Sequence, residues 1–209
     1  MAINLDNTAI VLIDPYNDFL HEGGKMYFAT KEDLVRKNTI ENLKTLVKFA
    51  RSKNIPIYYG LHQQFREGFF DGWKHMAHIH EDIKRTATFA EGSFGALIYE
   101  GLEPSLENGD VVVSKHWNSS SFQNTDLDFQ LHQREITKLV LAGMTANTCL
   151  ESTARYGYEL GYHVTLLTDA TAGFDPKATD AATDIIWPIF ASHVTTVGEF
   201  IKDTESFGR

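Results

Sequence analysis

Three side chains that could carry chemistry stand at or just beyond the ends of predicted strands. Asp14 closes the apolar run AIVLID, Lys115 directly follows DVVVS, and Cys149 lies seven residues after KLVLA. Each alone has an ordinary structural interpretation: a turn residue, a solvated cation and a buried, inert thiol. Together they supply the base, the positive charge and the nucleophile that a thiol hydrolase needs.

The segment from Gly143 to Cys149 (GMTANTC) strengthens this interpretation. It connects a predicted strand to a predicted helix, which places Cys149 near the first turn of that helix. Unpaired backbone N–H groups and the helix dipole at such a position favour the thiolate, and the same groups can hold an oxyanion. Strand, tight turn, nucleophile and helix form the same design as the nucleophile elbow of serine hydrolases.

The elements that must position these residues alternate between strand and helix. Short apolar runs predict strands at 9–14, 55–59, 110–114, 138–142, 163–168 and 193–197. Helical periodicity covers 33–53 and 147–160, followed by Gly161, with shorter stretches at 125–133, 180–190 and 199–203. This alternation predicts an α/β domain with a parallel sheet covered on both faces. Residues 61–109 are the irregular part, and we expect them to form a substrate loop within one domain spanning 1–209.

Composition narrows the classes of function. The chain has 28 acidic and 19 basic residues, a net charge of −9 that disfavours nucleic acid as a partner. Its apolar runs are too short for a membrane helix, and the N-terminus lacks the basic start of a secretory signal. A single cysteine cannot form an internal disulfide, so we expect a cytoplasmic protein without membrane partners. The first strand is followed by DPYNDF rather than a glycine-rich turn, which argues against a dinucleotide cofactor.

Three segments carry a resemblance to a known family. VLIDPYNDF (11–19), VVVSKHWNSSSF (111–122) and LVLAGMTANTCLESTARYGYELGYHVTLLTDAT (139–171) are similar to the hallmark blocks of isochorismatase-like cysteine hydrolases. That superfamily includes nicotinamidases, N-carbamoylsarcosine amidohydrolase, ureide and biuret hydrolases, and isochorismatase. The similarity runs from about residue 8 to 198 and is lowest over 61–109.

The resemblance implies a three-layer α/β/α fold with a doubly wound, six-stranded parallel sheet in the order 3-2-1-4-5-6. It implies a catalytic triad of Asp14, Lys115 and Cys149, and a non-proline cis peptide between Met144 and Thr145. The backbone N–H groups of Thr145 and Cys149 would then form the oxyanion hole. Cys149 would attack an amide or carbamoyl carbon to form a thioester, Asp14 would move the protons, and Lys115 would stabilise the anions.

Two further groups of residues invite interpretation. Several nicotinamidases bind a metal through an Asp-x-His pattern after the second strand, but this chain has Leu61-His62-Gln63-Gln64 there. The histidines at 62, 75, 78 and 80 are therefore predicted not to bind a metal, and no cofactor is expected. An aromatic substrate pocket is expected from Tyr16, Phe19, Trp73, Trp117 and Phe122.

Two other functions remain open. A true isochorismatase cleaves a vinyl ether by protonation and needs no thiol, and a non-catalytic binding protein could share the fold. The expected partners are a small-molecule substrate and further copies of this chain, because relatives usually assemble and the segment 65–73 is rich in aromatic residues that a monomer would expose. The sequence does not identify the substrate.

Overall fold

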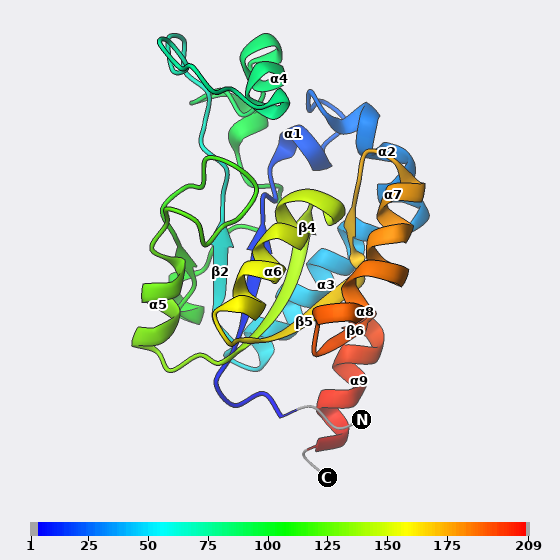
Figure 1. Cartoon of the computed structure of the whole chain (residues 1–209). Coiled ribbons are helices and arrows are strands. Elements are labelled where there is room, and N and C mark those ends of the chain that lie inside the picture. Colours follow the sequence, from blue (N-terminus) through cyan, green and yellow to red (C-terminus); the bar gives the residue numbers. More distant parts are fainter. Residues whose placement is uncertain (1–3, 208–209) are drawn as a thin grey trace.

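The computed structural model describes residues 4–207 and contains one parallel six-stranded sheet flanked by helices (Figure 1). The strands are β1 (Thr8–Ile13), β2 (Ile57–Gly60), β3 (Val111–Val112), β4 (Lys138–Met144), β5 (His163–Ala172) and β6 (His193–Thr195). Their order in the sheet is β3-β2-β1-β4-β5-β6, so the predicted fold class and strand order are confirmed. The order reverses between β1 and β4, where an open α/β sheet places its ligand.

The central strand β1 explains how the two layers of the core form. All its residues are buried, and it pairs with β2 on one side and β4 on the other. Because side chains alternate along a strand, Ile10 and Leu12 pack into one apolar cluster, and Val11 and Ile13 into the other. A run without polar alternation is typical of a parallel strand covered on both faces.

Helices close both faces of the sheet. The α-helices are α1 (Asn17–Leu20), α2 (Tyr27–Arg36), α3 (Thr39–Ser52), α4 (His78–Thr86), α5 (Leu127–Gln133), α6 (Glu151–Glu159), α7 (Pro176–Asp180), α8 (Trp187–Phe190) and α9 (Val197–Phe207). Side chains of α2, α3 and α9 join the cluster of Ile10 and Leu12, whereas α5, α6 and α8 cover the opposite face. Short helical turns are η1 (Phe94–Ala96), η2 (Leu106–Asn108), η3 (Ala146–Leu150) and η4 (Ala181–Ile186).

The helix predicted over 33–53 is two helices in the structure. Asn38 adopts a left-handed conformation with φ of 53°, which ends α2 and starts α3 in a new direction. Apolar periodicity continues across the break because both helices pack on the same face of the sheet. The apolar periodicity therefore predicts correctly which side chains are buried, but it does not show the turn at Asn38.

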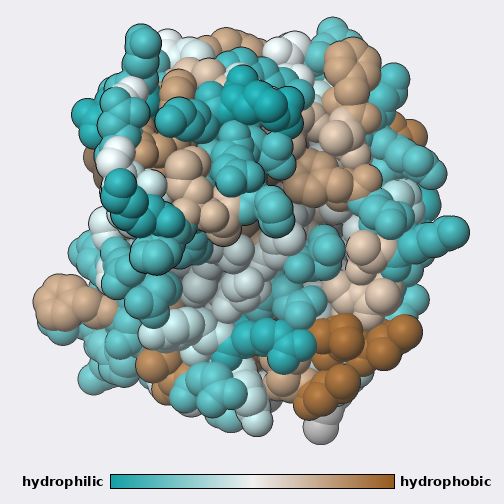
Figure 2. All heavy atoms as spheres, turned by 45° about the horizontal axis from the view of Figure 1, so that its top comes forward, coloured by the Kyte–Doolittle hydropathy of each residue, from teal (hydrophilic) through white to brown (hydrophobic). Residues whose placement is uncertain are grey.

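Residues 61–109 hold α4, the short turns η1 and η2, and otherwise irregular chain; α4 lies above the carboxyl ends of the strands (Figure 1), whereas Asn108 binds the Ile55 carbonyl close to the start of β2. Within residues 4–207, no helix is both long and apolar enough to cross a membrane. Figure 2 shows the molecule with this upper side turned forward, and apolar side chains are scattered among polar ones across it.

Candidate active site

Asp14 lies directly beyond the end of β1 and is 1% exposed. Its backbone N–H donates to the Gly60 carbonyl at 2.9 Å, and its φ of 45° is unusual for a residue with a side chain. Such a conformation costs on the order of 1–3 kcal/mol and often occurs where function fixes a side chain. The turn aims the carboxylate at the gap between β1 and β4.

The segment after β4 brings Cys149 to the same gap. Gly143 pairs with Ile13, and a Cβ on it would lie 2.1 Å from the Ile13 carbonyl oxygen, so only glycine fits there. The peptide bond between Met144 and Thr145 is cis, and η3 begins directly afterwards. Cys149 lies inside η3 and is buried.

Asp14 and Cys149 interact directly. Burial raises the pKa of the Cys149 thiol well above its ordinary value, and the charge and hydrogen bond of Asp14 raise it further. Hydrogen bonds from the Thr148 side chain and the Thr145 backbone oppose this shift without cancelling it. The thiolate expected at the helix terminus is therefore not the resting form, because burial and the charge of Asp14 both favour the neutral thiol. The resting pair is a thiol beside a carboxylate.

The structure does not bring Lys115 to this pair. Its neighbour His116 is 0% exposed and places Nε2 3.2 Å from Asp14 Oδ1. Lys115 is half-buried, and among residues 4–207 its side chain makes no hydrogen bond or ion pair. Segment 115–117 runs beside the end of β2 in an extended form, with a parallel bridge between His62 and His116. Adjacent side chains of extended backbone point to opposite sides, so only one of the two can face Asp14.

His62 is a second histidine at the site. Its backbone N–H donates to Asp14 Oδ1 at 2.6 Å, and its Nδ1–H donates to the Gln63 carbonyl at 2.9 Å. Burial lowers the pKa of His62, and the neighbouring His116 lowers it further, so this imidazole is neutral. Its Nε2 is buried and has no partner among residues 4–207.

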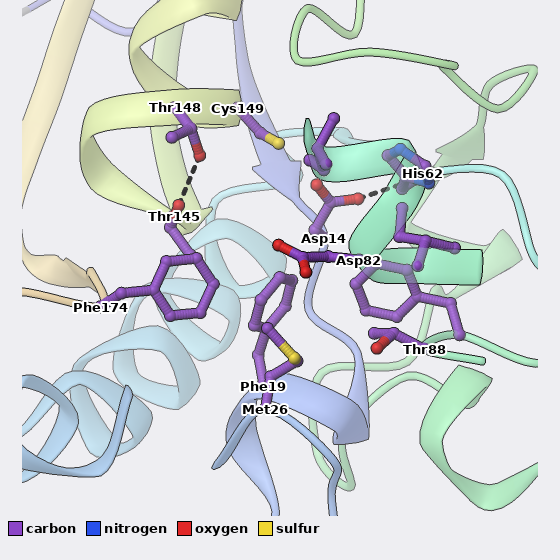
Figure 3. A pocket seen from close by; sticks show the side chains of 13 residues that line it. Asp14, Phe19, Met26, His62, Asp82, Thr88, Thr145, Thr148, Cys149 and Phe174 are labelled. Carbon is purple, nitrogen blue, oxygen red and sulfur yellow. Dashed lines mark hydrogen bonds between the residues drawn. The ribbon is translucent and has the colours of Figure 1, made fainter. Parts of the chain in front are cut away.

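A cavity of about 240 Å³ opens in front of Asp14 and Cys149 (Figure 3). Its walls come from the segment after β1, from 62–89, from η3 and from the segment after β5. The lining side chains are mainly apolar: Asp14, Phe19, Met26, His62, Ile79, Asp82, Ile83, Thr88, Phe89, Thr145, Thr148, Cys149 and Phe174. Its volume suits a small molecule.

Of the five aromatic residues expected in the pocket, the structure places only Phe19 in the lining. Tyr16 is buried beneath it and donates to the His62 carbonyl at 2.9 Å. Phe122 stacks on Tyr156 on the far side of the sheet. The side chains that follow β3 point to both faces of the sheet, and Phe122 belongs to the face away from the cavity. Phe122 therefore does not reach the cavity, although it lies only seven residues after Lys115 in the sequence.

Trp73 and Trp117 belong to a separate aromatic cluster outside the cavity. Trp117 stacks on Phe69 with ring centres 4.8 Å apart, and Trp73 packs edge-on against Phe70. Within the segment 65–73, Phe70 is buried but Trp73 remains 38% exposed, so the segment keeps part of the aromatic surface expected of it. Large apolar side chains that are more exposed lie elsewhere, including Phe28, Ile185 and Ile189.

Asp18 connects two walls of the cavity. It is buried, and its carboxylate accepts the backbone N–H of Lys25 at 2.9 Å and that of Phe89 at 2.6 Å. Gly95 approaches it so closely that a Cβ there would lie 2.1 Å from Asp18 Oδ1. The loops that carry Phe19, Met26 and Phe89 are therefore joined through one side chain.

Among residues 4–207, no group of three or more histidine, cysteine or acidic side chains is arranged to hold a metal ion. The histidines between residues 62 and 80 do not form one cluster in the structure. His78 is exposed beside Glu81, whereas His80 accepts the Ala77 N–H and donates to the Trp117 carbonyl. His80 therefore closes the start of α4 and holds the aromatic cluster.

Comparison with known proteins agrees with this geometry. The model of the isochorismatase domain matches residues 8–198. The chain belongs to the isochorismatase-like hydrolase family. A ureidoacrylate amidohydrolase, RutB, from Agrobacterium fabrum is 30% identical over 96% of this chain and 91% of its own. A cysteine hydrolase from Pseudomonas syringae pv. phaseolicola has a TM-score of 0.81 at 25% identity, covering 99% of this chain and 96% of its own.

One similar protein is named as a probable inactive enzyme. A protein from Arabidopsis thaliana named a probable inactive nicotinamidase is 30% identical over 85% of this chain and 86% of its own. Family membership alone does not establish activity, so the activity of this chain has to be argued from its own residues. The predicted family resemblance is confirmed.

The sequence reasoning missed His116, Thr88, Phe89 and Phe174. For His116 a signal exists: extended backbone after a strand alternates its side chains, so a one-residue shift in register selects the neighbour of Lys115. The other three lie on loops whose path depends on contacts distant in sequence, and no local pattern marks them.

Proposed function

We propose that this protein hydrolyses the C–N bond of a small amide or carbamoyl compound through a thioester on Cys149. The observation that carries the proposal is the contact between the buried Cys149 thiol and the Asp14 carboxylate at the end of a mainly apolar cavity. A thiol with a raised pKa needs a base beside it to become a nucleophile, and Asp14 is that base.

The first half-reaction follows from these positions. Asp14 takes the proton from the thiol while sulfur bonds to the carbonyl carbon, and the carbonyl oxygen becomes an oxyanion. Backbone N–H groups of Thr145 and Cys149 would stabilise that charge. Asp14 then returns the proton to nitrogen, the C–N bond breaks, and ammonia or an amine leaves.

Water completes the cycle. Asp14 removes a proton from water as its oxygen attacks the thioester, the C–S bond breaks, and the proton passes to sulfur. The same carboxylate thus acts as base and acid in turn. Vinyl-ether hydrolysis would make no use of the Asp14–Cys149 contact.

The test is turnover of a panel of small amides, ureides and carbamoyl amines by the wild type, Cys149→Ala and Asp14→Asn. Both variants should lose at least about 100-fold in kcat. Mass spectrometry of rapidly quenched wild type should show the acyl group on Cys149, the only cysteine of the chain, so no other thiol can be the source. Turnover that persists in Cys149→Ala would exclude the thioester route.

A further inference from the structure

We infer that His116, as an imidazolium, supplies the positive charge of this active site and positions Asp14, in the role that the family resemblance assigns to Lys115. This inference rests on the proposed function for its kinetic consequences, but its structural basis is separate. It concerns which side chain faces the carboxylate.

The hydrogen bonds of His116 define its protonation. Nδ1 lies 2.7 Å from the Asn118 carbonyl oxygen, which can only accept, so Nδ1 carries a hydrogen. Nε2 lies 3.2 Å from Asp14 Oδ1, and the two residues are only 0% and 1% exposed. Two lone pairs cannot face each other at this distance in a buried site, so a proton lies between Nε2 and Oδ1.

That proton belongs on the imidazole. Burial alone would lower the pKa of His116, but the charge of Asp14 and the hydrogen bonds to Asp14 and Asn118 outweigh it and hold the pKa above 6.5. The other titratable groups near the pair are His62, which is neutral, Cys149, which is a thiol, and Tyr16, whose pKa is raised by burial and by the charge of Asp14. The resting site therefore contains an imidazolium, a carboxylate and a thiol.

The charge balance explains what His116 does during the reaction. Before attack, imidazolium and carboxylate cancel. Once Asp14 has taken the thiol proton, the remaining charges are the imidazolium and the anion on sulfur or on the carbonyl oxygen. The site stays neutral throughout, which a buried cavity requires. His116 acts through Asp14 and is a positioning residue.

The experiment compares four proteins: wild type, His116→Gln, His116→Lys and Lys115→Ala. His116→Gln should lose about 100-fold in kcat with little change in KM, because the charge matters most once sulfur is an anion. His116→Lys should recover part of that loss. Lys115→Ala should stay within about threefold of the wild type, as for a side chain away from the chemistry.

The pH profile separates a charge role from a purely structural one. Since the His116 pKa is raised, wild-type kcat/KM should fall with rising pH along a limb above pH 6.5. In His116→Lys this limb should move to higher pH, because an ammonium loses its proton later than an imidazolium. A profile unchanged by both substitutions would overturn the inference.

NMR titration of the histidines gives a readout that needs no turnover. In the wild type one imidazole should titrate above pH 6.5, and in Asp14→Asn the same imidazole should titrate lower. If wild type shows no amidase activity but this titration holds, the proposed function fails and the assignment of His116 survives. If activity is present and Lys115→Ala abolishes it while His116→Gln does not, the assignment is wrong.

A separate observation, the charge of the cavity lining, concerns the substrate class. From it we infer that the substrate is an uncharged small amide or ureide and carries no carboxylate. Among the described residues that line the cavity there is no lysine or arginine, but there are two carboxylates, Asp14 and Asp82 (Figure 3). This inference also rests on the proposed function.

Arg85 and Lys25 are close in sequence to lining residues, but each already has a partner of its own. Arg85 binds Asp82 Oδ1 at 2.7 Å, and the Lys25 ammonium donates to the Ala87 carbonyl. A carboxylate on the substrate would enter a mainly apolar cavity whose lining offers it no unpaired cation, because the charges of His116 and Asp14 already balance each other, and this is unfavourable. Ureidoacrylate, in the name of the RutB relative, carries such a carboxylate.

The test uses two compounds of nearly equal size, succinamide and succinamate, which differ in one amide against one carboxylate. Binding to Cys149→Ala is measured by calorimetry, so the comparison needs no catalysis. Succinamide should bind at least about 100-fold more tightly, since an unpaired buried charge costs more than that factor. Asp82→Lys should reduce the difference by about tenfold or more.

Arg85→Ala is the matched control. If Arg85 were in fact the anchor for a carboxylate, succinamate would be preferred by the parent protein and this preference would vanish in Arg85→Ala. Preference for succinamate, or failure of both compounds to bind at millimolar concentration, would overturn the inference. Binding of succinamide without its turnover by wild type would instead count against the thioester mechanism alone.

Discussion

Substitution of Gly143 by alanine tests whether the close approach of β1 and β4 holds the site together. The added Cβ would lie 2.1 Å from the Ile13 carbonyl oxygen, 2.7 Å from its nitrogen and 2.9 Å from its carbonyl carbon. These atoms are backbone of a strand paired on both sides, so they have little room to move. Overpacking of this kind costs about 1–3 kcal/mol.

A second cost comes from the φ of 113° at Gly143, which residues with a side chain rarely adopt. A positive φ adds about 1–2 kcal/mol. The sum is about 2–5 kcal/mol, and for a chain of this length each kcal/mol lowers Tm by about 2–4 °C. We therefore expect Gly143→Ala to unfold about 10 °C below the wild type in a thermal melt.

Two other glycines serve as controls. Gly161 has a φ of 92° but open space around it, so Gly161→Ala should show the backbone cost alone, about 2–8 °C. Gly198 has neither a positive φ nor a neighbour within 4 Å, so Gly198→Ala in α9 should leave Tm unchanged or raise it. If Gly143→Ala melts no lower than Gly161→Ala, the contact with Ile13 does not resist displacement and the reasoning fails.

Three further predictions concern the thiol, a metal and assembly. Because the Cys149 pKa is raised, iodoacetamide should label this thiol slowly at pH 7.5, and the labelling rate should rise only above the pH range in which ordinary thiols react. In Asp14→Asn the labelling rate should rise at lower pH. A wild-type profile like that of a free thiol would contradict the burial argument. Chelator treatment should leave activity intact, and activity lost to a chelator and restored by zinc or iron would show that the histidines near α4 were misread. Light scattering should give a mass above the 23.6 kDa of one chain. Ile189 is an exposed apolar position, so Ile189→Glu should lower the measured mass. A 23.6 kDa particle at micromolar concentration would refute assembly.

The sheet could be predicted from sequence because parallel strands leave an unambiguous signal. β1 and β4 read as unbroken apolar runs, since both of their faces are covered. Asp14 and Cys149 could be located for the same reason, as each is tied to the end of such a strand. Helix boundaries were less accessible: the turn at Asn38 leaves the apolar stripe continuous, so no local feature divides 33–53.

The sequence alone could not predict whether Lys115 or His116 faces Asp14. Beyond the short strand β3 the chain stays extended without lying in a buried run, so its register against β2 is fixed only by tertiary contacts such as that between His116 and Leu61. A shift of one position changes which side chain faces Asp14. The pocket is similar: Phe19 follows β1 closely and was found, whereas Phe174 and Phe89 reach the cavity from segments about 150 and 70 residues further along the chain.

The carboxylate of Asp18 has a consequence for how specificity can change in this protein. Since it fixes the backbones of two cavity walls by accepting their N–H groups, the frame of the cavity does not depend on which side chains project from it. A partly buried position such as Met26 can then be replaced without losing the shape of the opening, whereas Phe89 is 4% exposed and packs in the core. A chain built this way can adopt new substrates through few substitutions, and engineering of its selectivity should begin at those projecting side chains and leave Asp18 untouched.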